Sequence, residues 1–588
     1  MELDYSIDAT SPATRQLGIR LEFDCSSVAA PGGEVVLFLP TWTPGSYLIR
    51  EFSRHLGRVD AFDAGSGQAV PCEKVSKNRF RLQPAAGVER LRVTYSVYAH
   101  ELSVRNADLT AEHAYWNHAC VLLWPLERRQ LGASLTVRMP VGWEVACSLP
   151  VEVAANDHGR ETRVTLRAHD LDEVLDAPCL LGRFRRLDWM VGDVPHSIVL
   201  DGLASIRPAD TLVADLAAIV RAASAVFGGP LPYPRYLFLA LFAGDGHGGL
   251  EHRDSTTLLM GRTAFRSDKG YREFLSLAAH ELFHAWNAKR LRPREFWVYD
   301  YEHENYTSLL WLIEGWTAYY DDLICLRAGL FTPEEYLAIV ARNLTAMRNA
   351  PGRFRLSLAE SSFDAWIRLY RPDENTRNSS QNYYGNGAIA ALCLDLSIRR
   401  ESGGARNLDW VLRDLYESTF RAGRGYTLAD VEAAVQRIGG PACSQAMQQW
   451  TTGSLDPDVG SLLAAFGCRL SAKDVDRPFL GITFDASRTT IASVQVDAPA
   501  HNGGLAPGDE ILAIAGLRID SDRWQEVFQA VAVIGTPLEV LYARRGVVSR
   551  LQVVPTAGPG VASVEIDAKA APEQVALREG WIPRIARP

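Results

Sequence analysis

The stretch FLSLAAHELFHAWN, residues 274–287, decides how the middle of this 588-residue chain is organised. It is an apolar run that carries the pattern H-E-x-x-H. Histidines four residues apart lie on one face of a helix, so the imidazoles of His280 and His284 can bind one metal ion. Glu281 is then placed to take a proton from the attacking water. The alternative, two histidines satisfied in a core helix, would leave Glu281 as a costly unpaired charge. We therefore predict a hydrolytic zinc site on a helix.

A third metal ligand is expected further along the chain. The metzincin pattern needs a histidine six residues after His284, but Arg290 stands there. Glu314 lies inside a second apolar run, 308–320 (SLLWLIEGWTAYY), where a lone carboxylate needs a partner. A buried salt bridge to an arginine would also satisfy it, but we favour the metal. Alternative ligands lie in a polar, loop-like stretch: Glu302, His303 and Glu304.

Composition and charge exclude several classes of protein. With 47% hydrophobic and 22% charged residues, the chain can bury large cores and is not globally disordered. A net charge of -9 argues against a nucleic-acid partner. No run reaches ~18 uninterrupted apolar residues, so no membrane span is expected. The nine dispersed cysteines indicate a reducing compartment. The start of the chain predicts a cytoplasmic location, or a periplasmic one if a leader was removed.

The pattern of apolar residues changes along the chain. Residues 1–204 show period-2 stretches such as 90–97 (RLRVTYSV), which predict an antiparallel β-domain with one buried face. Residues 205–456 are mostly helical in pattern. Residues 457–560 are β-rich again, and the Ala-, Pro- and Gly-rich residues 561–588 are expected to form a loosely held tail. We predict a multidomain α+β protein.

The two apolar runs together resemble the gluzincin zinc peptidases, which are related to aminopeptidase N and leukotriene A4 hydrolase. The segment Glu314-Gly315-Trp316 after H-E-x-x-H carries the resemblance. The long gap from His284 matches the glycyl aminopeptidase relatives, the PDZ-containing group. Two further segments match that group, 284–293 (HAWNAKRLRP) and 40–47 (PTWTPGSY). The resemblance covers nearly the whole chain.

This resemblance implies an architecture and a metal site. Residues 205–456 would form a thermolysin-like, mostly helical peptidase domain, and residues 457–560 a PDZ-like domain. One Zn2+ per chain would be held by His280, His284 and Glu314.

Two more motifs imply roles for site residues. The segment 248–252 (GGLEH) resembles the G-x-M-E-N exopeptidase motif, in which Glu251, with Gly249, would bind the free α-amine of the substrate. His252 and Leu250 replace the usual Asn and Met, and a solvent-exposed loop glutamate is the alternative. The segment 382–387 (NYYGNG) resembles the Y-x-x-G motif. It would make Tyr384, or else Tyr383, the donor to the oxyanion, unless both only pack in the core.

A last motif concerns the C-terminal part of the chain. The segment 477–482 (RPFLGI) resembles the carboxylate-binding loop of PDZ domains. It implies that Phe479, Leu480, Gly481 and Ile482 could bind the C-terminus of a peptide, although a purely structural role is an equal alternative.

The functional hypothesis is a zinc aminopeptidase that acts on peptides with a free N-terminus, with Gly and Ala preferred there. A broad aminopeptidase or an endopeptidase with the same zinc site is the first alternative. A non-catalytic peptide-binding scaffold is the second, but it predicts a broken ligand set, and the ligands and the base are all present. Nothing in the sequence supports an epoxide hydrolase.

Overall fold

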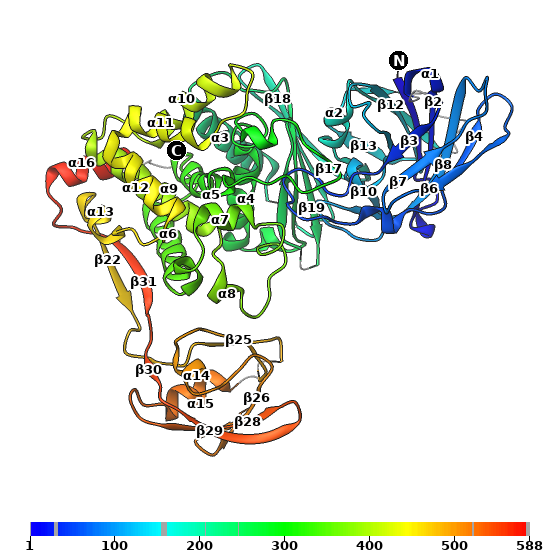
Figure 1. Cartoon of the computed structure of the whole chain (residues 1–588). Helices are drawn as coiled ribbons and strands as arrows, with labels where there is room; N and C mark the ends of the chain where they lie inside the picture. The colour runs from blue at the N-terminus through cyan, green and yellow to red at the C-terminus, as the bar shows by residue number, and fades with distance from the viewer. Residues whose placement is uncertain are drawn as a thin grey trace. The chain divides into compact units, whose positions relative to one another are not determined.

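The computed structural model describes residues 2–28, 33–153, 161–205, 207–244, 246–487, 489–519 and 523–583. The chain forms two compact units, Met1–Asn305 and Tyr306–Pro588. Strands dominate the first unit and helices most of the second (Figure 1). The predicted multidomain chain with an N-terminal β-rich part and a helical part is therefore confirmed. The domain limits at residues 204, 456 and 560 remain predictions.

The largest layer of the first unit is an eight-stranded sheet with the order β14-β15-β12-β1-β2-β8-β4-β5. Its strands are β1 (Glu2–Asp8), β2 (Gln16–Asp24), β4 (Asp60–Asp63), β5 (Ala69–Val70), β8 (Arg90–Tyr98), β12 (Gly132–Met139), β14 (Val151–Val153) and β15 (Thr162–Ala168). Alternate residues of the central strands are buried, as expected for a sheet with one face on a core. One pair departs from the predicted antiparallel pattern, because β1 and β12 are parallel.

Two four-stranded sheets complete the core of this β-rich part. The first comprises β13 (Glu144–Cys147), β16 (Cys179–Gly182), β10 (His113–Trp116) and β9 (Ala107–Leu109), and the second β11 (Trp124–Pro125), β3 (Val35–Phe38), β7 (Arg79–Leu82) and β6 (Cys72–Lys74). The short helix α2 (Leu171–Leu175) precedes β16.

A five-stranded sheet carries the helix of the H-E-x-x-H motif. Its order is β17 (Arg185–Val191), β18 (Val194–Asp201), β19 (Tyr236–Ala243), β21 (Ser255–Gly261) and β20 (Gly248–Glu251). β18, β19 and β21 are parallel, whereas β20 runs antiparallel to β21 at the edge. Helix α4 (Asp268–Phe283) packs on β20, β21 and α3 (Ala209–Phe227). The motif helix therefore lies against an edge strand.

The helical part of the second unit is built around α5 (Leu310–Arg327) and α9 (Gly385–Glu401), which cross at two glycines. A Cβ on Gly315 would lie 2.6 Å from the Cα of Gly387, so no larger residue fits. Around this pair lie α6 (Pro333–Arg348), α7 (Leu358–Phe363), α8 (Thr376–Ser379), α10 (Leu408–Leu415), α11 (Leu428–Gly439), α12 (Pro441–Thr452) and α13 (Val459–Ala465). No helix among the described residues has the length and hydropathy of a membrane span.

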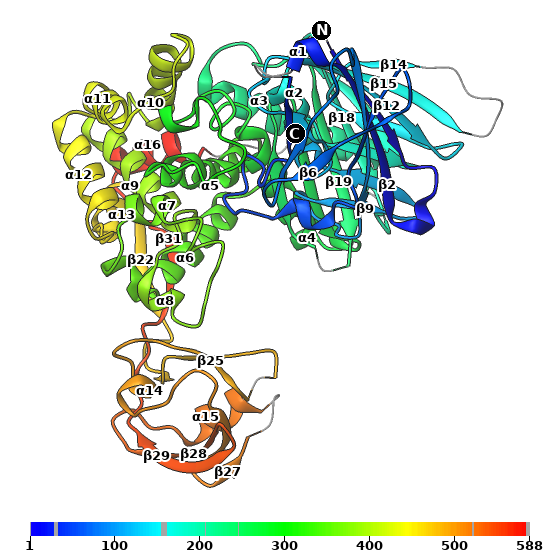
Figure 2. The same ribbon diagram turned by 45° about the vertical axis from the view of Figure 1, so that its right-hand side comes forward.

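A small module with its own core interrupts the last part of the second unit. Its elements are β24 (Ile482–Phe484), β25 (Ile491–Val494), α14 (Pro499–Asn502), β26 (Glu510–Ile514), α15 (Trp524–Val531), β28 (Leu538–Arg544) and β29 (Val547–Val553). The chain enters it after β22 (Cys468–Lys473) and leaves it before β31 (Val561–Ile566). These two strands pair antiparallel from Cys468–Ile566 to Lys473–Val561 (Figure 1 and Figure 2).

The expectation of a loose tail over 561–588 is wrong for residues 561–583. β31 pairs with β22, and α16 (Pro572–Trp581) follows. Trp581 is fully buried, with its ring against Tyr336 and Phe466. Alanine and proline suit a helix start as well as a loop, so composition alone misled the prediction. Residues 584–588 lie outside the described residues.

A buried histidine ties β10 to the end of β18. His113 Nδ1 lies 2.5 Å from Asp201 and Nε2 lies 3.1 Å from Asp108. Burial lowers the pKa of His113, but the bonds to Asp108 and Asp201 outweigh burial and raise it to about 9. The pKa in the folded state thus exceeds the value of ~6.5 expected on unfolding. The stabilisation is therefore complete below pH ~6.5 and lost as pH rises through about 9.

We expect His113→Gln to lower the melting temperature at pH 6.5 and to remove most of the loss of stability between pH 7 and pH 9.5. Thermal unfolding of both proteins at four pH values tests this expectation. A variant whose melting temperature falls in parallel with the wild type over that range would contradict the assignment.

Candidate active site

The two motif histidines lie together at the end of α4. His284 follows the last residue of the helix as its C-cap, and its N–H bonds to the carbonyl of His280. The ring centroids are 4.8 Å apart. Nδ1 of His284 lies 2.8 Å from the carbonyl oxygen of Asn287. With Nδ1 donating this bond, Nε2 is the nitrogen left for a metal, which is the usual arrangement of a metal-ligating histidine.

Glu281 is buried between α4 and the edge strand β20. A Cβ on Gly249 of β20 would overlap Oε1 of Glu281. The backbone of the edge strand is therefore in contact with the side chain of the predicted base, and a larger residue at that position would have to displace the Glu281 side chain. Gly249 was predicted to help bind the substrate amine, and its contact with Glu281 is an additional constraint on the site.

Glu251 ends the same strand and is 4% exposed. Over the described ranges, no hydrogen bond or ion pair engages its carboxylate. A ligand atom from each of Glu251, Glu281 and His284 lies within 4.8 Å of the other two. The charge of Lys289 acts on this carboxylate without bonding to it, so a cation bonded directly to Glu251 would stabilise it further. It is not the solvent-exposed loop residue of the alternative interpretation.

A turn from the N-terminal β-rich part reaches the Glu251 carboxylate. The turn closes with a bond from Ser46 N–H to the Thr43 carbonyl, and Gly45 in it has a φ of +92°. A Cβ on Gly45 would overlap both carboxylate oxygens of Glu251. The backbone conformation thus favours glycine here, and any side chain at this position would also displace the Glu251 carboxylate.

Two basic residues of the segment 284–293 hold the turn that follows Glu251. Lys289 Nζ donates to Asp176 at 2.9 Å, and His252 Nδ1 lies 3.3 Å from the same carboxylate oxygen. Arg290 pairs with Asp254 at 3.0 Å and donates to the carbonyl of Arg253. His252 therefore points to Asp176 and helps to fix the strand end. The sequence did not predict this network, because Asp176 lies 113 residues from Lys289.

Two further predicted site residues lie in the second unit, on α5 and at the start of α9. Glu314 is buried in the middle of α5, one residue before the crossing glycine Gly315. Tyr384 is the N-cap of α9 and lies 3.2 Å, hydroxyl to hydroxyl, from Tyr370. Burial and the charge of Glu314 raise the pKa of Tyr384 well above its ordinary value. Tyr384 thus keeps its proton at neutral pH. Tyr383 is fully buried, which makes it the weaker candidate for contact with a substrate.

Two groups of side chains in the described part of the chain could hold a metal ion. One is His280, His284 and Glu314, the predicted zinc ligands; the other is Glu251, Glu281 and His284. A donor set of two imidazoles and one carboxylate suits zinc and leaves a fourth position open. Of the alternative ligands, Glu302 is paired with Arg79 at 2.7 Å, and His303 pairs with Asp300. The first group fits the zinc chemistry better, since it leaves Glu281 available as a base.

The chain is similar to known proteins in its sequence and its fold. The family model described as M61 glycyl aminopeptidase matches residues 273–390, and the peptidase M61 N-terminal domain matches residues 4–183. The crystal structure of an aminopeptidase N family protein from Idiomarina loihiensis superposes with a TM-score of 0.89 and 28% identity, covering 99% of this chain and 100% of that chain. An M1 zinc metallopeptidase from Deinococcus radiodurans gives a TM-score of 0.47 and 18% identity, covering 78% of this chain and 94% of that chain. No curated protein sequence matches.

The fold and the matched segments define a peptidase. The matched ranges include the H-E-x-x-H motif, Glu314 and Tyr384. The chain belongs to the M61 glycyl aminopeptidase family, within the gluzincin aminopeptidases that its two apolar runs resemble.

The contact between Gly249 and Glu281 can be tested with a matched pair of variants. We expect Gly249→Ala to displace the Glu281 carboxylate and to lower kcat of peptide hydrolysis by at least tenfold. Gly244→Ala is the control, because a Cβ there meets no atom within 4 Å. Hydrolysis rates and circular dichroism of both variants provide the measurement. Equal activities of two folded variants would show that the contact does not matter.

Proposed function

We propose that this peptidase is a zinc-dependent aminopeptidase with His280, His284 and Glu314 as ligands of one Zn2+. The observation that carries the proposal is the buried carboxylate of Glu251, which makes no hydrogen bond or ion pair among the described residues and lies beside Glu281. A free ammonium group at the start of a peptide supplies the missing charge. An enzyme that binds the ammonium of its substrate cleaves from the amino end.

The residues divide the chemistry between them. Zinc, when bound, supplies a Lewis acid that polarises the scissile carbonyl and acidifies the attacking water. Glu281 takes the proton from that water and later delivers it to the leaving amine. Tyr384 donates a hydrogen bond to the oxyanion, and its raised pKa keeps the donor proton in place.

The edge strand β20 supports the orientation of the substrate. Glu251 and Gly249 lie on this strand, and β20 pairs with β21 on one side only. An extended peptide can add to such an edge through backbone hydrogen bonds. With the ammonium at Glu251, the first peptide bond then lies next to Glu281.

The proposal includes a preference for Gly and Ala at the N-terminus, and the resemblance to the glycyl aminopeptidases supports it. A broad aminopeptidase and an endopeptidase with the same site are the alternatives. Hydrolysis of Gly-, Ala- and Leu-arylamides, beside an N-acetylated peptide, separates the three. Cleavage of the blocked peptide at a comparable rate would favour the endopeptidase.

The module after residue 473 is proposed to be PDZ-like, with Phe479, Leu480, Gly481 and Ile482 as its carboxylate loop. Gly481 has a φ of +78°, and a Cβ there would overlap the Cβ of Ala498. The rings of Phe484 and Trp524 pack 4.7 Å apart between β24 and α15. These contacts belong to the module's own core, so peptide binding and a purely structural role stay as alternatives.

Replacement of the proposed base Glu281 is expected to lower the rate of hydrolysis without removing the metal. Glu281→Gln should lower kcat on Ala-arylamide by about 10²–10⁴-fold, because it removes general-base catalysis. Metal analysis should still find about one zinc per chain, since the ligands are intact. His280→Ala is the contrasting variant and should lose both zinc and activity. More than a tenth of wild-type kcat in Glu281→Gln would exclude Glu281 as the base.

Loss of the amine-binding carboxylate is expected to act mainly on KM. Glu251→Gln should raise KM for Ala-arylamide by about 10-fold or more, as a charge-assisted bond is removed. Gly45→Ala should have a similar, smaller effect by displacing Glu251. Gly87→Ala is the matched control, because Gly87 has a φ of +91° and open space around it. An unchanged KM in both Glu251→Gln and Gly45→Ala would refute the amine site.

A further inference from the structure

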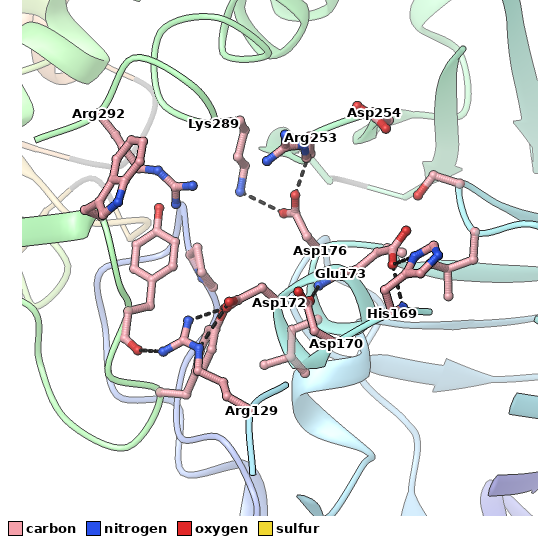
Figure 3. A pocket seen from close by; sticks show the side chains of 18 residues that line it. Arg129, His169, Asp170, Asp172, Glu173, Asp176, Arg253, Asp254, Lys289 and Arg292 are labelled. Carbon is pink, nitrogen blue, oxygen red and sulfur yellow. Dashed lines mark hydrogen bonds and ion pairs between the residues drawn. The ribbon is translucent and has the colours of Figure 1, made fainter. Parts of the chain in front are cut away.

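The first unit contains a polar cavity of about 480 Å³ beside the network around Asp176. It is lined by α2, by the turn after β20 and by the segment 289–301 (Figure 3). None of the proposed metal ligands, and neither Glu251 nor Glu281, lines it. Its volume lies in the range of sites for small molecules.

The carboxylates that line this cavity are already engaged. Asp170 accepts the N–H of Glu173, Asp172 pairs with Arg129, Glu173 with His169, Asp176 with Lys289, and Asp254 with Arg290. The acidic side chains therefore have no need of a cation from a ligand.

Two of the basic side chains are not engaged in this way. Among the described residues, no carboxylate lies within 4.0 Å of the guanidinium of Arg253 or of Arg292. Arg292 lies over the rings of Trp297 and Tyr299, at 5.5 and 5.3 Å, and its Nε is buried without a hydrogen-bond partner. Figure 3 shows both arginines along the same side of the cavity as Lys289.

We propose that this cavity binds a small organic carboxylate through Arg253 and Arg292, with Trp297 and Tyr299 against its apolar part. The planar guanidinium fork matches the two oxygens of a carboxylate. A single negative charge fits better than a phosphate dianion, because five carboxylates line the same cavity. The carboxylate has two possible sources, the acidic side chain of a substrate's first residue and a free acid.

Calorimetry on the full zinc-loaded chain tests the site with 3-phenylpropionate, a carboxylate that carries an aromatic body and no amine. Binding is expected for the acid and not for its neutral amide. Arg253→Gln and Arg292→Gln should each weaken binding by about tenfold. Arg294→Gln is the control, because Arg294 is exposed and outside the cavity. If both cavity variants bind 3-phenylpropionate as tightly as the wild type, the acid binds elsewhere, for example at zinc, and the proposal is wrong. Equal binding of the neutral amide, or tighter binding of inorganic phosphate, would also overturn it.

Hydrolysis of two arylamides shows whether the carboxylate belongs to a substrate's first residue or to a free acid. This second experiment rests on the proposed aminopeptidase function. If Arg292→Gln lowers kcat/KM for Glu-arylamide at least tenfold more than for Gln-arylamide, the site takes the substrate's side chain. Equal changes, with binding of 3-phenylpropionate still dependent on Arg292, assign the site to a free acid. A wild type that cleaves neither arylamide would refute the aminopeptidase, whereas the calorimetric result would stand independently.

Discussion

The contact between the edge strand β20 and helix α4 is the constraint on which the proposed active site depends. Gly249 allows the backbone of β20 to touch the side chain of Glu281, and Gly45 allows a turn of the β-rich part to touch Glu251. Two carboxylates with ligand atoms less than 4.8 Å apart repel each other, so each must be held in place. Here backbone atoms restrict both side chains by excluded volume.

The second unit uses glycine in the same way. Gly315 and Gly387 let α5 and α9 cross at close contact, and the residues next to them are Glu314 and the turn that begins at Tyr384. This close crossing places Tyr384 near Glu314, and burial together with the charge of that carboxylate raises the pKa of the phenol. A larger residue at either glycine would separate a proposed metal ligand from a proposed oxyanion donor.

Much of this arrangement could be predicted from the sequence, and the reasons differ by residue. His280, Glu281 and His284 were predictable because helical spacing fixes their geometry locally. Glu314 was predictable because a charge in an apolar helix needs a partner. The roles of Lys289, His252 and Asp176 were not, since their contacts join segments far apart in the chain. The tail was predicted wrongly because the burial of Trp581 depends on helices that composition does not reveal.

The pairing of β22 with β31 has a consequence for the order in which the protein is made. The module is an insertion between two paired strands, so the ribosome completes it before α16 emerges. The rings of Tyr336 and Phe466 can therefore pack against Trp581 only after more than a hundred further residues have been synthesised. The helical part is thus completed only when α16 has been made, and the module has time to form its own core first.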